Sequence, residues 1–180
     1  MSNTITRGFL AGFLSVLIFH QGMVFLMHHV GSGIPVLVLI FGPQTDLPYN
    51  MVPVPPLHVP EVLAKAFWGG IWGIILAALL RELRMSELLF GLAFGAVVLT
   101  MVGFDLIARL KGLPPLPSDD RQAWWSAGLY NGCWGLGTAA LLQRLAERPG
   151  SLARWRAEAA ARRKAEPAAR QYGGAPQGPG

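Results

Sequence analysis

Charged residues are scarce in this chain of 180 residues. They make up 14% of the sequence, whereas hydrophobic residues make up 52% and the mean hydropathy is +0.41. A typical soluble domain carries about 25% charged residues. The composition therefore excludes an ordinary soluble domain and indicates a membrane protein.

The chain also has little cysteine and no alternating strand pattern. Cys133 is the single cysteine, so an intrachain disulfide is excluded. Long apolar runs without alternation favour helices over a barrel, because backbone polar groups in lipid must be paired internally. A helix needs roughly 20 apolar residues to cross a bilayer. The sequence predicts an all-α integral membrane fold in residues 1–146, with four spans at about 8–30, 62–83, 88–108 and 123–145.

Residue patterns that would indicate catalysis, phosphate binding or metal binding are absent too. The sequence contains no nucleophile paired with a base, no phosphate-binding loop, no zinc-ligand set and no pair of catalytic carboxylates. We therefore expect no enzymatic activity, no catalytic residue, no metal site and no cofactor.

The second and fourth spans repeat each other. Residues 67–83, FWGGIWGIILAALLREL, align with residues 129–145, LYNGCWGLGTAALLQRL, at an offset of 62, and eight of the seventeen positions match. The informative matches are Gly70 with Gly132, Trp72 with Trp134 and Gly73 with Gly135. A proline cluster precedes each copy. We infer a duplicated helical hairpin.

Small residues recur at a spacing of four in the predicted spans. This spacing lets helix backbones approach closely in lipid. The predicted helix-packing residues are Gly8, Gly12, Gly69, Gly73, Gly91, Gly95 and Gly135.

The distribution of Lys and Arg predicts the orientation. One side of the predicted spans holds Arg7, Arg81, Arg84 and all eight basic residues from Arg144 onward, eleven of the fifteen in the chain. Because cytoplasmic loops carry the excess of Lys and Arg, we expect both termini in the cytoplasm. Each hairpin then enters from the same side, so the repeats are parallel.

Polar side chains at membrane depth are candidate sites, because they are costly there unless paired. His20, Gln21 and Asn131 fall at similar depths, and we expect them to form an intramembrane polar cluster. One interpretation is a hydrogen bond that fixes helix register. The others are a haem, metal or proton-relay role.

A second candidate group lies near the outer face. His28, His29 and Asp105 are expected there and would form a protonatable group. The alternative is that Asp105 pairs with Arg109, four residues further along the same helix.

The segments outside the spans are simpler. Residues 34–41 are apolar but too short to cross, and we expect them in the interface or against the end of the bundle. The proline-rich residues 42–60 predict an extended cover without regular helix or strand. Residues 147–166 predict a basic cytoplasmic helix, which either binds anionic lipid or stays solvated, and residues 167–180 predict disorder.

The stretches FHQGM, NMVPVPPLHVP and AFWGGIWG together resemble uncharacterised small multi-pass proteins of proteobacteria. The resemblance covers residues 7–83 and implies the bacterial inner membrane, without an activity. The expected role is a structural or accessory component of a membrane complex. The alternatives are a small transporter or channel and a haem- or metal-binding redox subunit. The expected partners are the lipid bilayer and other membrane subunits or further copies of this chain, with no nucleic acid.

Overall fold

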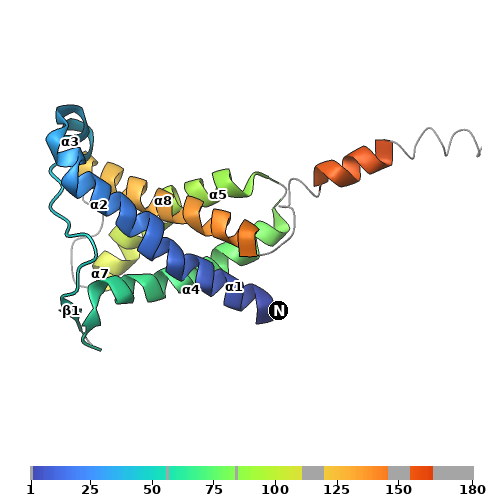
Figure 1. The fold of residues 1–180 in the computed structure, drawn as a ribbon, viewed down its shortest axis with the longest axis horizontal. Coiled ribbons are helices and arrows are strands. Elements are labelled where there is room, and N and C mark those ends of the chain that lie inside the picture. Colours follow the sequence, from blue (N-terminus) through green and yellow to red (C-terminus); the bar gives the residue numbers. More distant parts are fainter. Residues whose placement is uncertain (1, 56, 84, 111–119, 146–154, 164–180) are drawn as a thin grey trace, which may run out of the picture.

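The structure, a computed structural model, describes residues 2–55, 57–83, 85–110, 120–145 and 155–163. Four long helical segments form the bundle, and the prediction of a helical fold is confirmed (Figure 1). The first segment comprises α1 (Ser2–Ser15), the π-helical turn η1 (Val16–His20) and α2 (Gln21–His29). The second is α4 (Glu61–Glu82) and the fourth is α8 (Arg121–Leu145).

The third segment changes its winding along its length. It comprises α5 (Glu87–Ala93), the π-helical η3 (Phe94–Leu99), α6 (Thr100–Val102), the π-helical η4 (Gly103–Ile107) and α7 (Ala108–Leu110). π-Helical turns shift the hydrogen-bond ladder and frequently occur at functional sites. No pattern in the sequence predicted these turns.

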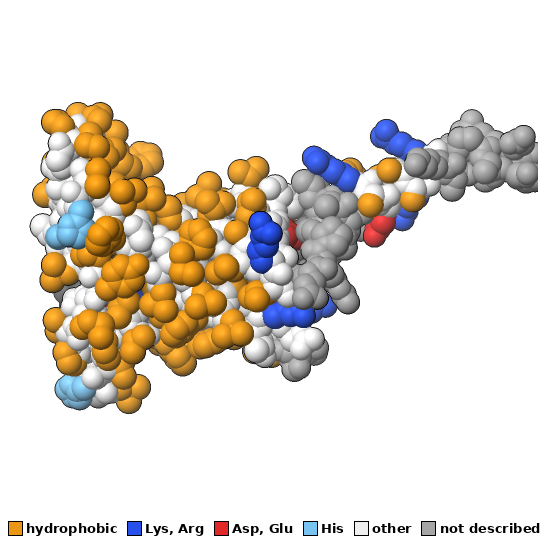
Figure 2. Space-filling view, viewed as in Figure 1, with side chains coloured by type: hydrophobic (Ala, Val, Ile, Leu, Met, Phe, Trp, Pro, Cys, Tyr) orange, Lys and Arg blue, Asp and Glu red, His pale blue; other side chains and the backbone are white. Residues whose placement is uncertain are grey.

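Three helical segments are long and apolar enough to cross a membrane. They are Asn3–Gly33, Glu61–Glu82 and Glu87–Leu106, with mean hydropathies of 1.9, 1.8 and 2.0. Hydrophobic side chains cover the visible surface between the two ends of the bundle (Figure 2). The fourth predicted span, α8, is not among the three. Its sequence contains more glycine, hydroxyl and amide side chains, and several of them, including Gly135 and Thr138, are buried.

The first segment and α4 pack through glycine. A Cβ atom on Gly12 would overlap the carbonyl oxygen of Gly69, and one on Gly73 would overlap the carbonyl oxygen of Gly8. At the end of this pair, Arg81 Nη1 donates a hydrogen bond of 2.8 Å to Thr4 Oγ1. The backbones therefore touch directly.

The third segment and α8 pack in the same way. A Cβ atom on Gly135 would overlap the carbonyl oxygen of Gly91, and one on Gly95 would overlap that of Asn131. Gln143 Nε2 donates a hydrogen bond of 3.1 Å to Glu87 Oε2 at the end of this pair. Close backbone contact thus joins the helices two by two.

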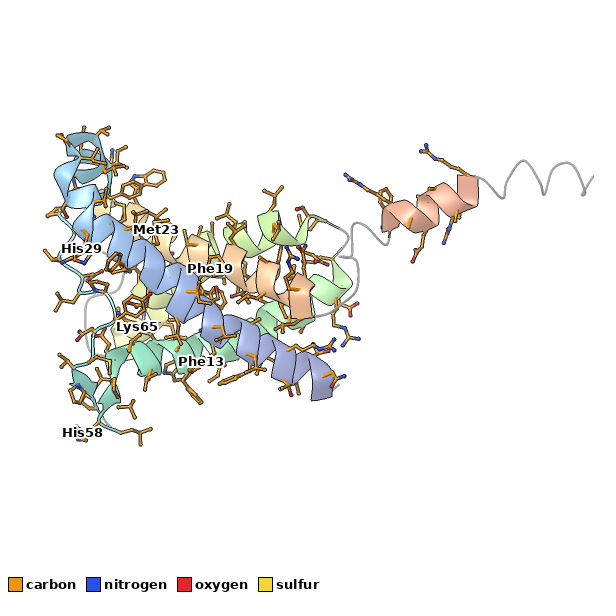
Figure 3. All side chains as sticks on the ribbon, in the orientation of Figure 1. Phe13, Phe19, Met23, His29, His58 and Lys65 are labelled. Atoms are coloured by element: carbon orange, nitrogen blue, oxygen red, sulfur yellow. The ribbon has the colours of Figure 1, made fainter. Side chains whose placement is uncertain are left out.

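The first segment also crosses α8, and this contact joins the two pairs. Trp134 is 1% exposed, and its Nε1 donates a hydrogen bond of 2.9 Å to the carbonyl oxygen of Gly12. Phe19, labelled in Figure 3, lies with its ring against Gly137 of α8. Trp72 is only partly buried, and its ring centroid lies 6.3 Å from that of Phe94 on η3.

The connection between α2 and α4 covers one end of the bundle. After the short turn η2 (Gly31–Gly33), α3 (Pro35–Phe41) packs against the start of α8. Ser126 Oγ donates a hydrogen bond of 2.6 Å to the carbonyl oxygen of Phe41. The expectation that this apolar run packs against the end of the bundle is confirmed.

The proline-rich segment contains a two-stranded antiparallel ladder, so the prediction of no regular strand was wrong. The strands are β1 (Pro53–Val54) and β2 (Val59–Pro60), with Pro53 opposite Pro60. Proline is tolerated here because a two-stranded ladder consists of edge strands only. The same segment provides acceptors for the first N–H groups of α4, which have no partner within the helix. The backbone N–H of Glu61 donates to the carbonyl oxygen of Val52, and that of Val62 donates to the carbonyl oxygen of Asn50.

Residues 155–163 form a further helix with a largely exposed surface. The predicted helix over 147–166 extends beyond these residues on both sides. The remainder of that range and the predicted disorder of 167–180 lie outside the described residues.

Candidate functional site

Buried and partly buried polar side chains lie on the first helical segment and on α8. We call this group the polar seam, and it consists of Ser15, His20, Gln21, Tyr130 and Thr138. Ser15 and Thr138 are 0% exposed and Gln21 is 2% exposed. Because such groups are costly inside an apolar bundle, their hydrogen-bond partners decide what they do.

The two hydroxyl groups of the seam share one acceptor. Ser15 Oγ donates a hydrogen bond of 2.6 Å to the carbonyl oxygen of Trp134, and Thr138 Oγ1 donates one of 2.8 Å to the same atom. Neither hydroxyl lies next to a base in these contacts. Their arrangement joins the first segment to α8 and gives no nucleophile.

Gln21 holds the connection between α2 and α4 against the bundle. Its Oε1 accepts a hydrogen bond of 2.7 Å from the backbone N–H of Tyr49. Tyr49 in turn donates from its hydroxyl to the carbonyl oxygen of Leu17, within η1, at 3.0 Å. Tyr49 has a φ of 52°, an uncommon left-handed conformation for a residue other than glycine. Gln21 therefore fixes a strained turn over the π-helical segment.

His20 lies at the last position of η1. Its ring centroid is 5.9 Å from that of Tyr130 on α8. Its Nδ1 atom is buried and has no hydrogen-bond partner among the described residues. The hydroxyl of Tyr130 donates to Gln44 Oε1, in the connection after α3. His20 is thus the one member of the seam with an unpaired buried nitrogen in the described part of the chain.

The expected cluster of His20, Gln21 and Asn131 is not what these contacts form. Asn131 Nδ2 donates a hydrogen bond of 3.1 Å to Thr100 Oγ1 on α6, and no hydrogen bond joins the three side chains within the described ranges. Depth along the bundle was the basis of the prediction, but rotation about α8 also matters. Successive residues lie about 100° apart on a helix. Tyr130 therefore faces His20, while Asn131 faces the third segment.

The expected outer group of His28, His29 and Asp105 is also divided. Asp105 Oδ1 accepts from Arg109 Nε at 2.7 Å, which is the alternative pairing expected four residues apart. The ring centroids of His28 and His29 lie 4.9 Å apart, and His29 lies 4.3 Å from Phe25. No ion pair or hydrogen bond links Asp105 to either histidine where the structure describes the chain.

Metal-binding side chains do not cluster in the described residues. No group of three or more His, Cys, Asp or Glu side chains there is placed to hold an ion. Cys133 is partly buried on α8 and belongs to no such group.

A cavity that no sequence pattern predicted lies at the covered end of the bundle. Its volume is about 280 Å³, and it lies between the loop after α3 and the start of α8. Asp46 and Asp120 line it together with Gln44, Gln122 and Ser126. Gln44, Ser126 and Gln122 all have internal partners there, and Asp120 Oδ1 accepts from the amide of Ala123. Most of its polar lining thus serves local folding.

Comparison with protein-family models, with curated proteins and with solved structures finds no match to this chain.

Proposed function

We propose that this chain is a four-span protein of the bacterial inner membrane, built from two parallel copies of a helical hairpin with both termini in the cytoplasm. The first copy consists of the first helical segment and α4, and the second consists of the third segment and α8. α8 supplies the fourth crossing. Its length of 25 residues is sufficient for that crossing.

Equivalent contacts in the two pairs support the duplication. The fourth span aligns with the second at an offset of 62, and the third aligns with the first at an offset of 83, which superimposes Gly8 and Gly12 on Gly91 and Gly95. Under these offsets four contacts correspond: Thr4–Arg81 with Glu87–Gln143, Gly8–Gly73 with Gly91–Gly135, Gly12–Gly69 with Gly95–Asn131, and Phe9–Gly70 with Leu92–Gly132. Unrelated hairpins have no reason to place four contacts at the same two offsets.

The role we propose is that of a non-enzymatic structural or accessory component of a membrane complex. The observation that carries it is the use of buried polar side chains within the bundle. Ser15, Gln21 and the partly buried Asn131 each hydrogen-bond to another segment of the chain, and Thr138 bonds within α8 to the carbonyl oxygen of Trp134. Backbone contact at the glycines leaves no space for a solute between the paired helices at those positions. The interior therefore serves packing, and the outer surface remains for lipid and partner subunits.

Purification of the tagged protein from native membranes in a mild detergent, followed by mass spectrometry, tests this role. We expect defined membrane-protein partners in stoichiometric amounts. A tagged inner-membrane protein of similar abundance serves as the control for adventitious capture. Isolation of this chain without any partner would contradict the proposal.

One observation favours a second candidate, a small transporter or channel. The buried Nδ1 of His20 has no partner among the described residues, so it is free to bind a transported species. If His20 acts in transport, His20→Leu abolishes flux without lowering protein abundance. A haem- or metal-binding redox subunit, the third reading, requires a Soret band or bound metal in the purified protein.

A further inference from the structure

The helix at residues 155–163 carries an uneven distribution of charge. Its sequence, WRAEAAARR, contains three arginines and one glutamate. Trp155 is 47% exposed, and the three arginines are exposed. Within the described part of the chain, no hydrogen bond or ion pair joins these side chains to the bundle.

The three arginines share a face with the tryptophan. At about 100° per residue, Trp155, Arg156, Ala159, Arg162 and Arg163 fall within roughly 120° of the helix circumference. Ala157, Ala160 and Ala161 occupy the opposite side, and Glu158 lies at the edge beside Arg162. We call the first side the Trp-Arg face. One indole is therefore flanked by guanidinium groups on both sides.

We propose that the Trp-Arg face binds the anionic headgroups of the membrane in which this chain is embedded. Indole rings favour the headgroup level of a bilayer, and arginine reaches the phosphate groups with its guanidinium. Each basic residue near an anionic surface contributes about a five-fold preference for it. The proposal rests on the cytoplasmic placement of the C-terminus proposed above, because the anionic leaflet faces that side.

The position of the helix in the chain favours lipid over nucleic acid. Leu145 ends α8, and the nine intervening residues reach at most about 30 Å. The helix is therefore held close to the bilayer surface. An indole can stack on bases as well as lie at the headgroup level, so the short connection to α8 is what favours lipid.

The full-length protein in lipid nanodiscs tests the proposal. Hydrogen–deuterium exchange of residues 155–163 is compared between phosphatidylcholine and a mixture of phosphatidylcholine with phosphatidylglycerol. We expect several-fold slower exchange in the anionic nanodiscs and loss of this difference at high salt. The double variant Arg156→Gln with Arg163→Gln should weaken the association by roughly 25-fold and remove most of the protection.

A rearranged variant of the same composition is the matched control. Arg156→Ala, Ala157→Arg, Ala161→Arg and Arg163→Ala together keep the net charge and move two arginines off the Trp-Arg face. We expect this variant to lose protection as well. Equal exchange in the two lipids, retained protection in either variant, or equal protection by a short RNA in phosphatidylcholine nanodiscs would overturn the proposal. Nanodiscs expose both faces of the bilayer to solvent, so the result does not depend on how the protein is oriented in the cell membrane.

Discussion

Trp134 donates its indole N–H to the carbonyl oxygen of Gly12 at 2.9 Å, across 122 positions of sequence. The bond joins α8 to the first helical segment, and Ser15 of that segment donates back to the carbonyl oxygen of Trp134 at 2.6 Å. The two bonds connect the first helical pair to the second. Trp72, at the equivalent position of α4, instead packs its ring against Phe94.

This relationship predicts different costs for the two tryptophans. Trp134→Phe removes a buried hydrogen bond and leaves a small cavity, so we expect the free energy of unfolding to fall by about 1–3 kcal/mol. Trp72→Phe, at a partly buried ring, should cost less. Thermal unfolding of both variants in detergent, monitored by the loss of the monodisperse peak, measures the difference in stability. Equal losses would show that the bond to Gly12 contributes nothing.

The glycine contacts predict a second contrast. Gly135→Ala places a methyl group into the backbone of Gly91, and we expect it to destabilise the bundle by about 1–3 kcal/mol or more. Gly22→Ala is the matched control, because nothing lies within 4 Å of its added Cβ. The control should be as stable as the natural protein or more stable by up to about 1 kcal/mol.

Denaturation in mixed micelles with increasing sodium dodecyl sulfate gives both values. Should Gly135→Ala unfold at the same detergent fraction as Gly22→Ala, close packing of α8 on the third segment would be refuted.

The sequence predicted those features of the fold that depend on regular spacing of residues. Long apolar runs indicated the helices, and the spacing of Gly8, Gly12, Gly91 and Gly95 marked residues that the structure places at helix contacts. Spacing does not specify rotation about an axis, which is why Asn131 was expected beside His20. The turn at Tyr49 depends on hydrogen bonds to Gln21 and Leu17, which are distant in the sequence, so local sequence carries no signal for it.

Replacing His20 should not lower the free energy of unfolding, in contrast to the destabilising substitutions above. A buried polar atom without a partner costs about 1–3 kcal/mol. Replacing the ring by an apolar side chain removes that cost, so His20→Leu should be at least as stable as the natural protein. Phe19→Leu, one residue earlier and against Gly137, should destabilise by loss of packing. A marked destabilisation by His20→Leu in the same unfolding assay would contradict this, because it would show that the contacts of the ring, such as that with Tyr130, outweigh the cost of the unpaired nitrogen.

Gln21 should control the covering connection. Gln21→Leu removes the acceptor of the Tyr49 amide while keeping an apolar side chain of similar size in a position that is 2% exposed. We expect hydrogen exchange at Tyr49 and its neighbours to accelerate about ten-fold, which corresponds to about 1.4 kcal/mol of lost local stability. Tyr49→Phe keeps the hydrogen bond from the backbone N–H of residue 49 to Gln21, so it should accelerate exchange of that N–H less. Unchanged exchange in Gln21→Leu would contradict the anchoring role.

Topology of α8 is the most direct test of the duplicated four-span architecture. Single cysteines at Thr45, Met85, Arg121 and Ala157, each in a Cys133→Ala background, are exposed to a membrane-impermeant maleimide in intact spheroplasts and after permeabilisation. We expect labelling at Thr45 and Arg121 in intact spheroplasts, and labelling at Met85 and Ala157 only after permeabilisation. Labelling of Arg121 and Ala157 from the same side would show that α8 does not cross, and would contradict the four-span architecture.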